Sequence, residues 1–322
     1  RWLARMSGPA ACGAAIKANG YGLGAEEVMR RLTHAGCRDF FVSNWGEALA
    51  LEPLMADGVR LSVLHGVRDE DMAVATTSRA KPVLCAPAQI ARWRDAGQKS
   101  CDVMIDTGMN RLGLDWRCDA AGMLAGLTIE TVMSHLASAD EEVALNAVQR
   151  DRFAQIALGV PAERYSLANS AGIALGADYA FDLTRPGLSL YGGVPRAELD
   201  GPIRQVARPE ASLIQVKELQ AGEKVGYNAT FTAPARMKAG VVSLGYADGI
   251  LRSWAGAHFR WGETPLPILG KVSMDMIVID LTTAPELGEG DWVELPYWLP
   301  DAAQQTSLSQ YELLTVLGQR FG

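Results

Sequence analysis

Residues 14–24 read AAIKANGYGLG, and the interpretation of the whole chain starts from them. The apolar residues predict a short buried strand that ends at Lys17, followed by a glycine-rich turn and a helix near residue 25. A lysine at the end of such a strand can lie in a dry environment that lowers its pKa, which favours formation of a Schiff base. The glycines let the backbone approach a ligand, and the helix start suits an anion. A lysine that reaches solvent beside an ordinary turn explains this stretch equally well.

The composition is that of a globular protein, with 322 residues of which 48% are hydrophobic and 21% are charged. This length predicts two domains, or one large barrel with an appended domain. The formal net charge of −7 argues against a broad nucleic-acid surface, so we expect no nucleic-acid partner. Because no apolar run is long enough to span a bilayer, we expect no membrane partner.

Cysteine and histidine spacing argues against metal and disulfide sites. The five cysteines are scattered and form no CxxC pair, and the four histidines show no HExxH spacing. We therefore predict no bound metal, and a reducing, cytoplasmic compartment fits the thiols best. Residue 1 is arginine, so we expect the natural chain to begin earlier.

From residue 14 to about 191, short apolar runs alternate with segments of helical periodicity. The predicted strands are 14–17, 39–42, 61–65, 82–85, 101–105, 129–134, 164–167 and 181–184. The predicted helices are 25–35, 46–56, 87–96 and 141–158. Eight strands in this length favour a (β/α)8 barrel over residues 1–204, although an open doubly wound sheet would show the same alternation.

After Gly193 the pattern changes to strands with few helices. The predicted strands are 211–219, 225–231, 237–243, 265–268, 276–280 and 292–295, and a terminal helix is predicted at 309–318. The predicted fold class is therefore α/β, with a (β/α)8 barrel followed by a mostly-β domain over residues 205–322.

Polar residues follow several of the predicted barrel strands, where (β/α)8 barrels carry their catalytic groups. They are Lys17, Arg111, His135, Ser170 and Arg185. Each has a structural explanation by itself, such as a loop ion pair for Arg111, a helix cap for Ser170 or a satisfied core histidine for His135. Their coincidence on one rim of a barrel favours a functional site.

This set of residues suits pyridoxal phosphate. The lysine would bind the aldehyde of the cofactor, and backbone N–H groups after the seventh and eighth strands would bind its phosphate. Arg185 is best placed to meet the pyridine nitrogen, and an arginine cannot stabilise a protonated ring as a carboxylate does. A neutral ring is a weaker electron sink, which disfavours transamination and favours prompt reprotonation at the α-carbon. The predicted chemistry is racemisation.

A racemase needs a base on each face of the reacting carbon. Lys17 can serve one face, and the predicted barrel offers no clear second base. Tyr246 lies between glycines in the sequence SLGYADG of the predicted β domain, and it could reach the site across a subunit interface. As a base it would need a cationic neighbour to stabilise its phenolate, whereas a turn tyrosine that only packs its ring is the structural alternative.

The motifs IKANGYGLGA, MIDTGMNRLGL, SHLASAD, NSAGIAL, RPGLSLYGG, GYADG and KVSMDMIVIDL occur in this order and span nearly the whole chain. Together they resemble the alanine racemases, a family of fold-type III pyridoxal phosphate enzymes. The resemblance implies a (β/α)8 barrel, a C-terminal β domain and a head-to-tail homodimer in which two subunits share each active site. It implies the interconversion of L-alanine and D-alanine, either to supply D-alanine for peptidoglycan or to catabolise it.

The resemblance also implies residue roles. Lys17 would hold the cofactor as a Schiff base and act on the D-face proton, and Tyr246 of the partner subunit would act on the L-face proton. The residues implied in cofactor binding, besides Lys17, are Tyr21, Arg111, His135, Ser170, Arg185, Gly187 and Leu188. Arg111 would also contact the substrate carboxylate, and Met274 and Asp275 would line the substrate pocket from the other subunit.

The sequence departs from the family pattern at two places. Many relatives have a carbamylated lysine two residues before the aspartate of the DTGMNR motif, where it holds the arginine. Here that position is Met104, so Arg111 needs another support or a bound anion. Residues 1–322 also lack the family's first strand and its C-terminal tyrosine. Either the natural chain extends beyond both ends, which we expect because Arg1 is not a native start, or phosphate binding and the entrance are altered.

Three other activities stay open from the sequence. A pyridoxal phosphate carrier protein of similar barrel would lack the second domain and the second base, so residues 205–322 count against it. A fold-type III decarboxylase usually has an acidic partner for the pyridine, which Arg185 disfavours. A broad-specificity or serine racemase shares the motifs, because pocket residues such as Met274 tune side-chain size by only about 1–3 kcal/mol.

Overall fold

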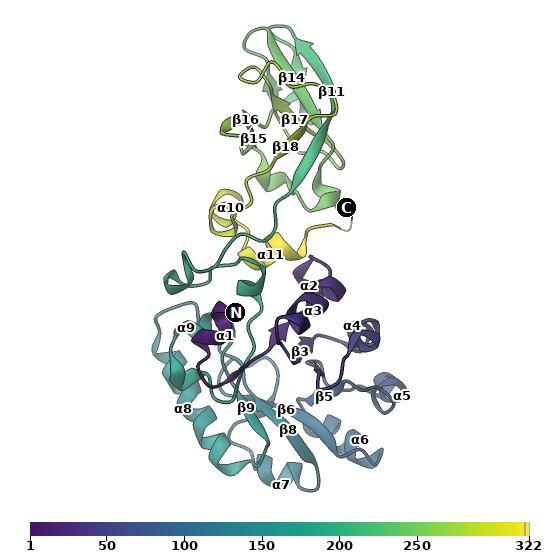
Figure 1. The fold of residues 1–322 in the computed structure, drawn as a ribbon, viewed down its shortest axis with the longest axis vertical. Helices are drawn as coiled ribbons and strands as arrows, with labels where there is room; N and C mark the ends of the chain where they lie inside the picture. The colour runs from purple at the N-terminus through teal and green to yellow at the C-terminus, as the bar shows by residue number, and fades with distance from the viewer. Residues whose placement is uncertain (319, 322) are drawn as a thin grey trace. The chain divides into compact units, whose positions relative to one another are not determined.

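A computed structural model of the chain describes residues 1–318, 320 and 321. It divides into two compact units, which we call the N-terminal and C-terminal units. The N-terminal unit comprises Arg1–Leu190 and Val194–Ile203 (Figure 1). The C-terminal unit comprises Tyr191–Gly193 and the described chain from Arg204 on.

Parallel strands form the centre of the N-terminal unit. The strands of the main sheet are, in order, β2 (Ala14–Ala15), β3 (Asp39–Val42), β4 (Arg60–Val63), β5 (Lys81–Leu84), β6 (Ser100–Asp106), β8 (Thr128–Met133) and β9 (Arg164–Ser166). The short β7 (Leu114–Asp115) pairs with β6, and β1 (Ala11–Cys12) pairs in parallel with β10 (Leu183–Thr184).

Strand β10 joins the two ends of the main sheet. On one side, the N–H of Arg185 donates to the carbonyl of Ala168, just beyond β9. On the other side, the N–H of Ala15 in β2 donates to the carbonyl of Pro186. The predicted (β/α)8 barrel is thereby confirmed, with strand ends that differ from the prediction by only one or a few residues.

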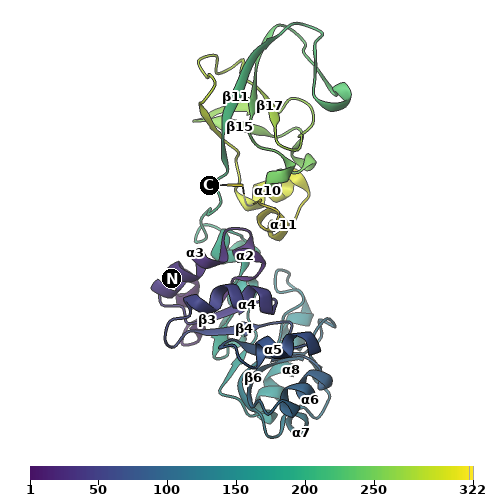
Figure 2. The same cartoon turned by 90° about the vertical axis from the view of Figure 1, so that its right-hand side faces the viewer.

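Helices flank the barrel strands on the outside (Figure 2). They are α1 (Trp2–Met6), α3 (Ala25–His34), α4 (Trp45–Leu51), α5 (Met72–Ala75), α6 (Pro87–Asp95), α7 (Ala120–Leu124), α8 (Ala144–Gly159) and α9 (Ser170–Ala174). The element α2 (Lys17–Tyr21) is instead a left-handed turn at the end of the first barrel strand. Acidic residues in the first turn of α3 interact favourably with the positive end of the helix dipole. Proline is the first residue of α6, where the N–H that it lacks would have no partner within the helix.

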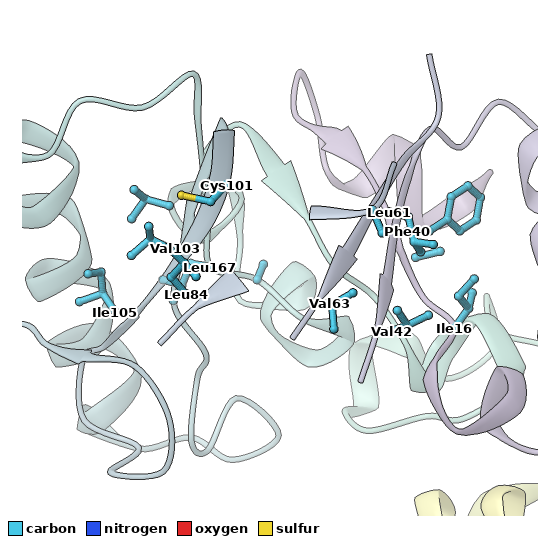
Figure 3. Packing of buried hydrophobic residues seen from close by; sticks show 14 of the residues in the cluster. Ile16, Phe40, Val42, Leu61, Val63, Leu84, Cys101, Val103, Ile105 and Leu167 are labelled. Atoms are coloured by element: carbon cyan, nitrogen blue, oxygen red, sulfur yellow. The ribbon is translucent and has the colours of Figure 1, made fainter. Parts of the chain in front are cut away.

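The core of the N-terminal unit lies between the strands and these helices. Figure 3 shows alternate strand residues of this core, among them Phe40 and Val42 of β3 and Val103 of β6, each with no measurable exposure. Burying such a side chain fully stabilises the fold by about 1.5–3 kcal/mol. Side chains on the opposite face of the strands point into the barrel. There the Ser62 hydroxyl of β4 donates to the Asp102 carboxylate of β6 at 2.6 Å, although β5 lies between these two strands in the sheet. Burial on both faces explains why these strands read as continuous apolar runs.

Antiparallel strands dominate the C-terminal unit, as predicted. Its main sheet has the order β16 (Thr264–Pro267), β15 (His258–Trp261), β18 (Trp292–Glu294), β11 (Glu210–Leu219), β14 (Met237–Val242) and β17 (Ile277–Asp280). The strands β12 (Lys224–Val225) and β13 (Phe231–Thr232) form a separate hairpin, and α10 (Leu299–Thr306) and α11 (Gln310–Thr315) follow the sheet. In the described part of the chain, every helix is too short or too polar to cross a bilayer.

Several local predictions are wrong for identifiable reasons. The predicted strand 225–231 is the β12–β13 hairpin, because Gly226 and Asn228 adopt left-handed backbone conformations with φ of 69° and 61°. The sequence pattern missed β15, in which Phe259 is the only fully buried residue, so that no apolar run marks it. It also missed α10, whose proline lies in the first turn and therefore starts the helix.

Candidate active site

Lys17 opens a left-handed turn, whereas the sequence predicted that it ends a strand. Residues 18–21 all have φ between 53° and 64°, although only one of them is glycine. For an L-residue other than glycine, this conformation costs about 1–2 kcal/mol. The side chain of Asn19 offsets part of this cost by accepting the N–H of Ala25 at 3.0 Å, which ties the turn to the start of α3.

The Lys17 amine lies in a half-buried, mainly cationic environment. Burial lowers the pKa of Lys17 below its ordinary value, and the charge of Arg111 lowers it further. The Glu47 carboxylate acts in the opposite direction and raises it. A larger fraction of the amine is therefore unprotonated near neutral pH than for a surface lysine, as a Schiff-base lysine requires.

Ser170, Gly187 and Tyr21 meet at one place on the same rim. The Ser170 hydroxyl accepts the N–H groups of Gly187 at 3.0 Å and of Ser189 at 3.1 Å. A Cβ at position 187 would lie 2.3 Å from the Tyr21 hydroxyl, so a larger residue there would displace the Tyr21 side chain. Leu188, between these residues, is buried. The buried Ser189 hydroxyl has no hydrogen-bond partner among the described residues, which marks this cradle as a place for an oxygen-rich anion.

Arg185 is buried, at 7% exposure, below the same rim. Its guanidinium donates to the Ser166 hydroxyl and to the carbonyl of Ser134. Burial lowers the pKa of Arg185 to about 10, partly opposed by the charge of Asp102. Arg185 is therefore still a cation at neutral pH, and it can donate to a ring nitrogen but cannot accept a proton from it.

His135 follows β8 and lies among the cationic residues of the site. Burial lowers the pKa of His135 to about 3, with further contributions from the charges of Arg185, Arg111 and Lys17. The imidazole is consequently neutral at neutral pH. Since all three cations act on one side chain, the structure brings together the predicted barrel residues that carry charge.

Asp106 holds the loop that carries Arg111. Its carboxylate accepts the N–H groups of residues 108–110 at 2.9–3.1 Å and that of Arg111 at 3.1 Å. Met104 is buried, and a Cβ at position 113 would lie 3.1 Å from its Cγ. Four hydrogen bonds to one carboxylate therefore fix the backbone of the loop that ends at Arg111.

Gln149 of α8 links two strand ends beneath the site. Its side-chain oxygen accepts the N–H of Ala137 at 2.8 Å. Its amide donates to the carbonyl of His135 at 3.0 Å and to the Thr107 hydroxyl at 3.2 Å. The Thr107 hydroxyl also lies 2.8 Å from that of Ser134. This buried network couples the loop after β6 to the residues that follow β8.

The C-terminal unit brings Tyr246, Met274 and Asp275 together. The N–H of Tyr246 donates to the carbonyl of Ser273 at 3.0 Å, and the next N–H donates to the carbonyl of Met274 at 2.9 Å. A Cβ at position 245 would lie 2.3 Å from that Met274 oxygen, so the close approach depends on glycine. The Met274 side chain is 52% exposed and thus accessible.

Arginines flank this cluster of the C-terminal unit. The Arg252 guanidinium lies 5.6 Å from the ring centroid of Tyr246, within the range of a cation–π contact. Arg320 donates to Asp275 at 2.8 Å and to Asp248 at 2.7 Å. The Asp248 carboxylate in turn accepts the N–H of residue 245. Arg320 therefore joins Asp275 to Asp248, whose carboxylate fixes the backbone directly before Tyr246.

Sequence reasoning missed the polar residues that support the site from behind. These residues are Glu47, Thr107, Ser134, Gln149 and Ser166, whereas the sequence already indicates Asp106 as a loop ion-pair partner of Arg111, and Asp106 accepts its backbone N–H. Two carry a signal that can be recognised: Glu47 follows Asn44 at the capping spacing, and Gln149 is an isolated polar residue on the buried face of a helix. The structural alternative for Ser170, a helix cap, does not apply, because Asn169 caps α9 by accepting the N–H of Gly172 at 2.8 Å.

The residues of the N-terminal unit fit pyridoxal phosphate. An amine with a lowered pKa suits its aldehyde, and the cradle with the unpartnered Ser189 hydroxyl suits its phosphate. The cationic Arg185 and the neutral His135 suit an unprotonated ring. Within the residues that the structure describes, no cluster of His, Cys, Asp and Glu side chains is arranged to hold a metal ion.

Fold and site together define a class of enzyme: a (β/α)8 barrel that carries a reactive lysine and a phosphate cradle on its rim, followed by an antiparallel β domain. The model of the alanine racemase N-terminal domain matches residues 1–195, and that of the C-terminal domain matches residues 206–322. The chain belongs to the alanine racemase family.

Individual relatives agree with the family models over nearly the full length. The chain is 40% identical to the alanine racemase of Acidiphilium cryptum over 95% of this chain and 89% of the relative. It is 38% identical to the catabolic alanine racemase of Agrobacterium fabrum over 99% of this chain and 87% of the relative. Its fold matches the crystal structure of Bartonella henselae alanine racemase with covalently bound pyridoxal phosphate, with a TM-score of 0.92, 34% identity and coverage of 100% and 94%.

Proposed function

We propose that this protein interconverts L-alanine and D-alanine with pyridoxal phosphate held on Lys17. Three relatives named alanine racemase that share 38–41% identity over nearly the whole chain support the substrate. The phosphate cradle formed around Ser170, Gly187 and Tyr21 supports the cofactor. Leu188 and Ser189 complete the part of the cradle that follows β10.

The observation that carries the proposal is the surroundings of Arg185. In the described part of the chain, its guanidinium bonds to a serine hydroxyl and a backbone carbonyl and to no carboxylate. With a pKa of about 10, the charged form of the side chain outnumbers the neutral form about a thousandfold at pH 7. Arg185 would therefore keep the pyridine nitrogen of the cofactor unprotonated, and this disfavours transamination and decarboxylation relative to racemisation.

Two residues of this chain would move the proton. Bound pyridoxal phosphate withdraws electrons from the substrate α-carbon and so makes its α-proton acidic. The Lys17 amine takes or returns that proton on the D face, and the Tyr246 hydroxyl does so on the L face. Arg252 packs over the Tyr246 ring and would help to hold it in place. Arg111 would hold the substrate carboxylate. Asp106 fixes the backbone of Arg111 for this role.

The complete site would be shared within a homodimer. Lys17 and the cradle lie in the N-terminal unit, whereas Tyr246, Met274 and Asp275 lie in the C-terminal unit. We assign the latter three to the site of the partner subunit, where Met274 and Asp275 limit the side chain of the substrate. We place the reaction in the cytoplasm, because all five cysteines are free thiols. There it would supply D-alanine for cell-wall synthesis or catabolise it.

A chiral assay over a panel of L-amino acids, including serine, tests this proposal with purified protein and added cofactor. We expect alanine to be racemised fastest, without loss of the amino or carboxyl group. Lys17→Ala should abolish both the absorbance of the lysine-bound cofactor and racemisation. Tyr246→Phe should slow exchange of the L-alanine α-proton more than that of D-alanine. Full activity of Lys17→Ala, or equal loss for both enantiomers with Tyr246→Phe, would contradict the two-base assignment.

A further inference from the structure

The Glu47 carboxylate joins the Lys17 turn to the neighbouring strand. One of its oxygens accepts the N–H of Ala18 at 2.7 Å, and the other accepts the N–H of Ser43 at 2.7 Å. Ala18 directly follows Lys17, and Ser43 directly follows β3. Both are short hydrogen bonds to a charged acceptor, which are about twice as strong as neutral ones.

The geometry of the turn makes such a clamp necessary. Ala18 and Asn19 hold φ values of 53°, which are unfavourable for residues with a Cβ. Conformations of this kind persist at functional sites only where surrounding contacts fix them. The N–H of Ala18 donates to Glu47, which lies outside the turn. The direction in which the Lys17 side chain leaves the backbone therefore depends on that carboxylate.

Glu47 also has an electrostatic effect that a neutral clamp would lack. Arg111 and His135 are the other titratable groups that interact with Lys17, and Arg111 is a cation. Among the described residues, Glu47 is the one carboxylate whose charge raises the pKa of the Lys17 amine. Its side chain is itself fixed, because α4 begins at the Asn44 cap, which accepts the N–H of Glu47 at 3.0 Å.

We propose that Glu47 is a positioning residue for Lys17, which holds the left-handed turn in register with β3 and places a negative charge beside the reactive amine. This inference rests on the proposed function, because it concerns the residue that binds the cofactor. It goes beyond that function by assigning a role to a side chain to which the proposed proton transfers give none.

The chain offers a matched control in Glu52. It lies five positions further along, directly after α4, and its carboxylate accepts the N–H of Arg79 and the Ser78 hydroxyl, both at 2.8 Å. Glu52 thus also clamps a backbone N–H of a neighbouring segment, but it has no resolved influence on Lys17. A difference between the two variants isolates what Glu47 does for the site from what a half-buried carboxylate clamp does for the fold.

The experiment follows pyridoxal phosphate as it binds to the full-length chain after the resident cofactor has been removed. The Lys17 amine condenses with the cofactor aldehyde, a C=N bond forms, and water leaves. The rate of this step, read from absorbance, rises with pH as the amine loses its proton and then reaches a plateau. Wild type, Glu47→Gln, Glu47→Asp and Glu52→Gln are compared, together with Lys17→Ala and with the double variant Ala18→Gly/Glu47→Gln.

We expect Glu47→Gln to lower the plateau rate about tenfold, because the amine is less well aligned. Its midpoint should move to lower pH by about half a unit, because the neighbouring negative charge is gone. Glu47→Asp should lower the plateau without moving the midpoint. Ala18→Gly should restore part of the plateau in the Glu47→Gln background, because glycine adopts the turn without strain. Glu52→Gln should match the wild type in both quantities.

The inference is overturned if Glu47→Gln and Glu52→Gln behave alike. It is also overturned if the midpoint of Glu47→Gln moves to higher pH, because simple loosening of the turn would hydrate Lys17 and raise its pKa toward the ordinary value. If Glu47→Gln does not fold, the Glu47→Asp plateau and the double variant decide the question. Failure of the proposed function looks different: the wild type itself would form no C=N bond, or Lys17→Ala would form it equally well.

Discussion

Replacing Gln149 with leucine should destabilise the barrel by about 3–4 kcal/mol. Leucine fills much of the same volume, but it leaves the N–H of Ala137 and the carbonyl of His135 without partners next to a side chain that has no measurable exposure itself. Each buried unpaired group costs about 1–3 kcal/mol, while Thr107 keeps its contact with Ser134. For a unit of this size, such a loss corresponds to a fall in melting temperature of about 10 °C.

Thermal unfolding of the full chain, followed by circular dichroism, measures this change. Gln89→Leu is the matched control, because Gln89 also bonds a backbone N–H, that of Cys85 at 2.8 Å, and a backbone carbonyl, that of His65 at 3.2 Å. Gln89 is half-exposed, so water can replace its hydrogen bonds and the loss should stay below about 1 kcal/mol. If the two variants melt at the same temperature, burial does not set the cost and the reasoning fails.

Two further predictions concern the barrel interior and the cradle. Burial raises the pKa of Asp102 to about 6, whereas an unfolded aspartate titrates near 3.8, so the folded state binds the extra proton between these values. As the pH falls from 7 to 4, the unfolding free energy of the wild type should therefore rise by up to about 3 kcal/mol relative to that of Asp102→Asn. Urea titrations of both proteins at both pH values measure this difference, and a difference that does not change with pH would contradict the prediction. Ser170→Ala removes the acceptor for the N–H groups of Gly187 and Ser189. It should weaken the binding of pyridoxal phosphate about tenfold or more, as measured by equilibrium dialysis. Unchanged binding would contradict this prediction.

The sequence pattern predicted the barrel because both faces of its strands are buried. Apolar runs such as that around Phe40 and Val42 follow directly from this burial. The same reasoning placed Lys17, His135 and Arg185 at strand ends, where the barrel rule brings distant segments together. The electrostatic coupling of His135 to Lys17, Arg111 and Arg185 agrees with that placement.

Other features could not be derived from local pattern. The left-handed turn at 18–21 is unfavourable for its own residues, and contacts from Glu47 and Ala25 stabilise it, so sequence propensity argues against it. The support of Arg111 by Asp106 depends on a loop that folds back on one carboxylate. Gln149 lies far along the chain from Thr107 and Ala137, and only the packed helix shows which groups it meets.

The seam of the barrel constrains the order in which this protein can mature on the ribosome. The N–H groups of Ala11, Gly13 and Ala15 donate to carbonyls of Asp182, Thr184 and Pro186, so strands about 170 residues apart must meet. Closing so long a loop is slow compared with local folding, and it cannot begin before the later strand has emerged. Lys17 lies just two residues beyond the last of these bonds. The folded environment that lowers the pKa of the Lys17 amine therefore forms only after most of the N-terminal unit has been synthesised.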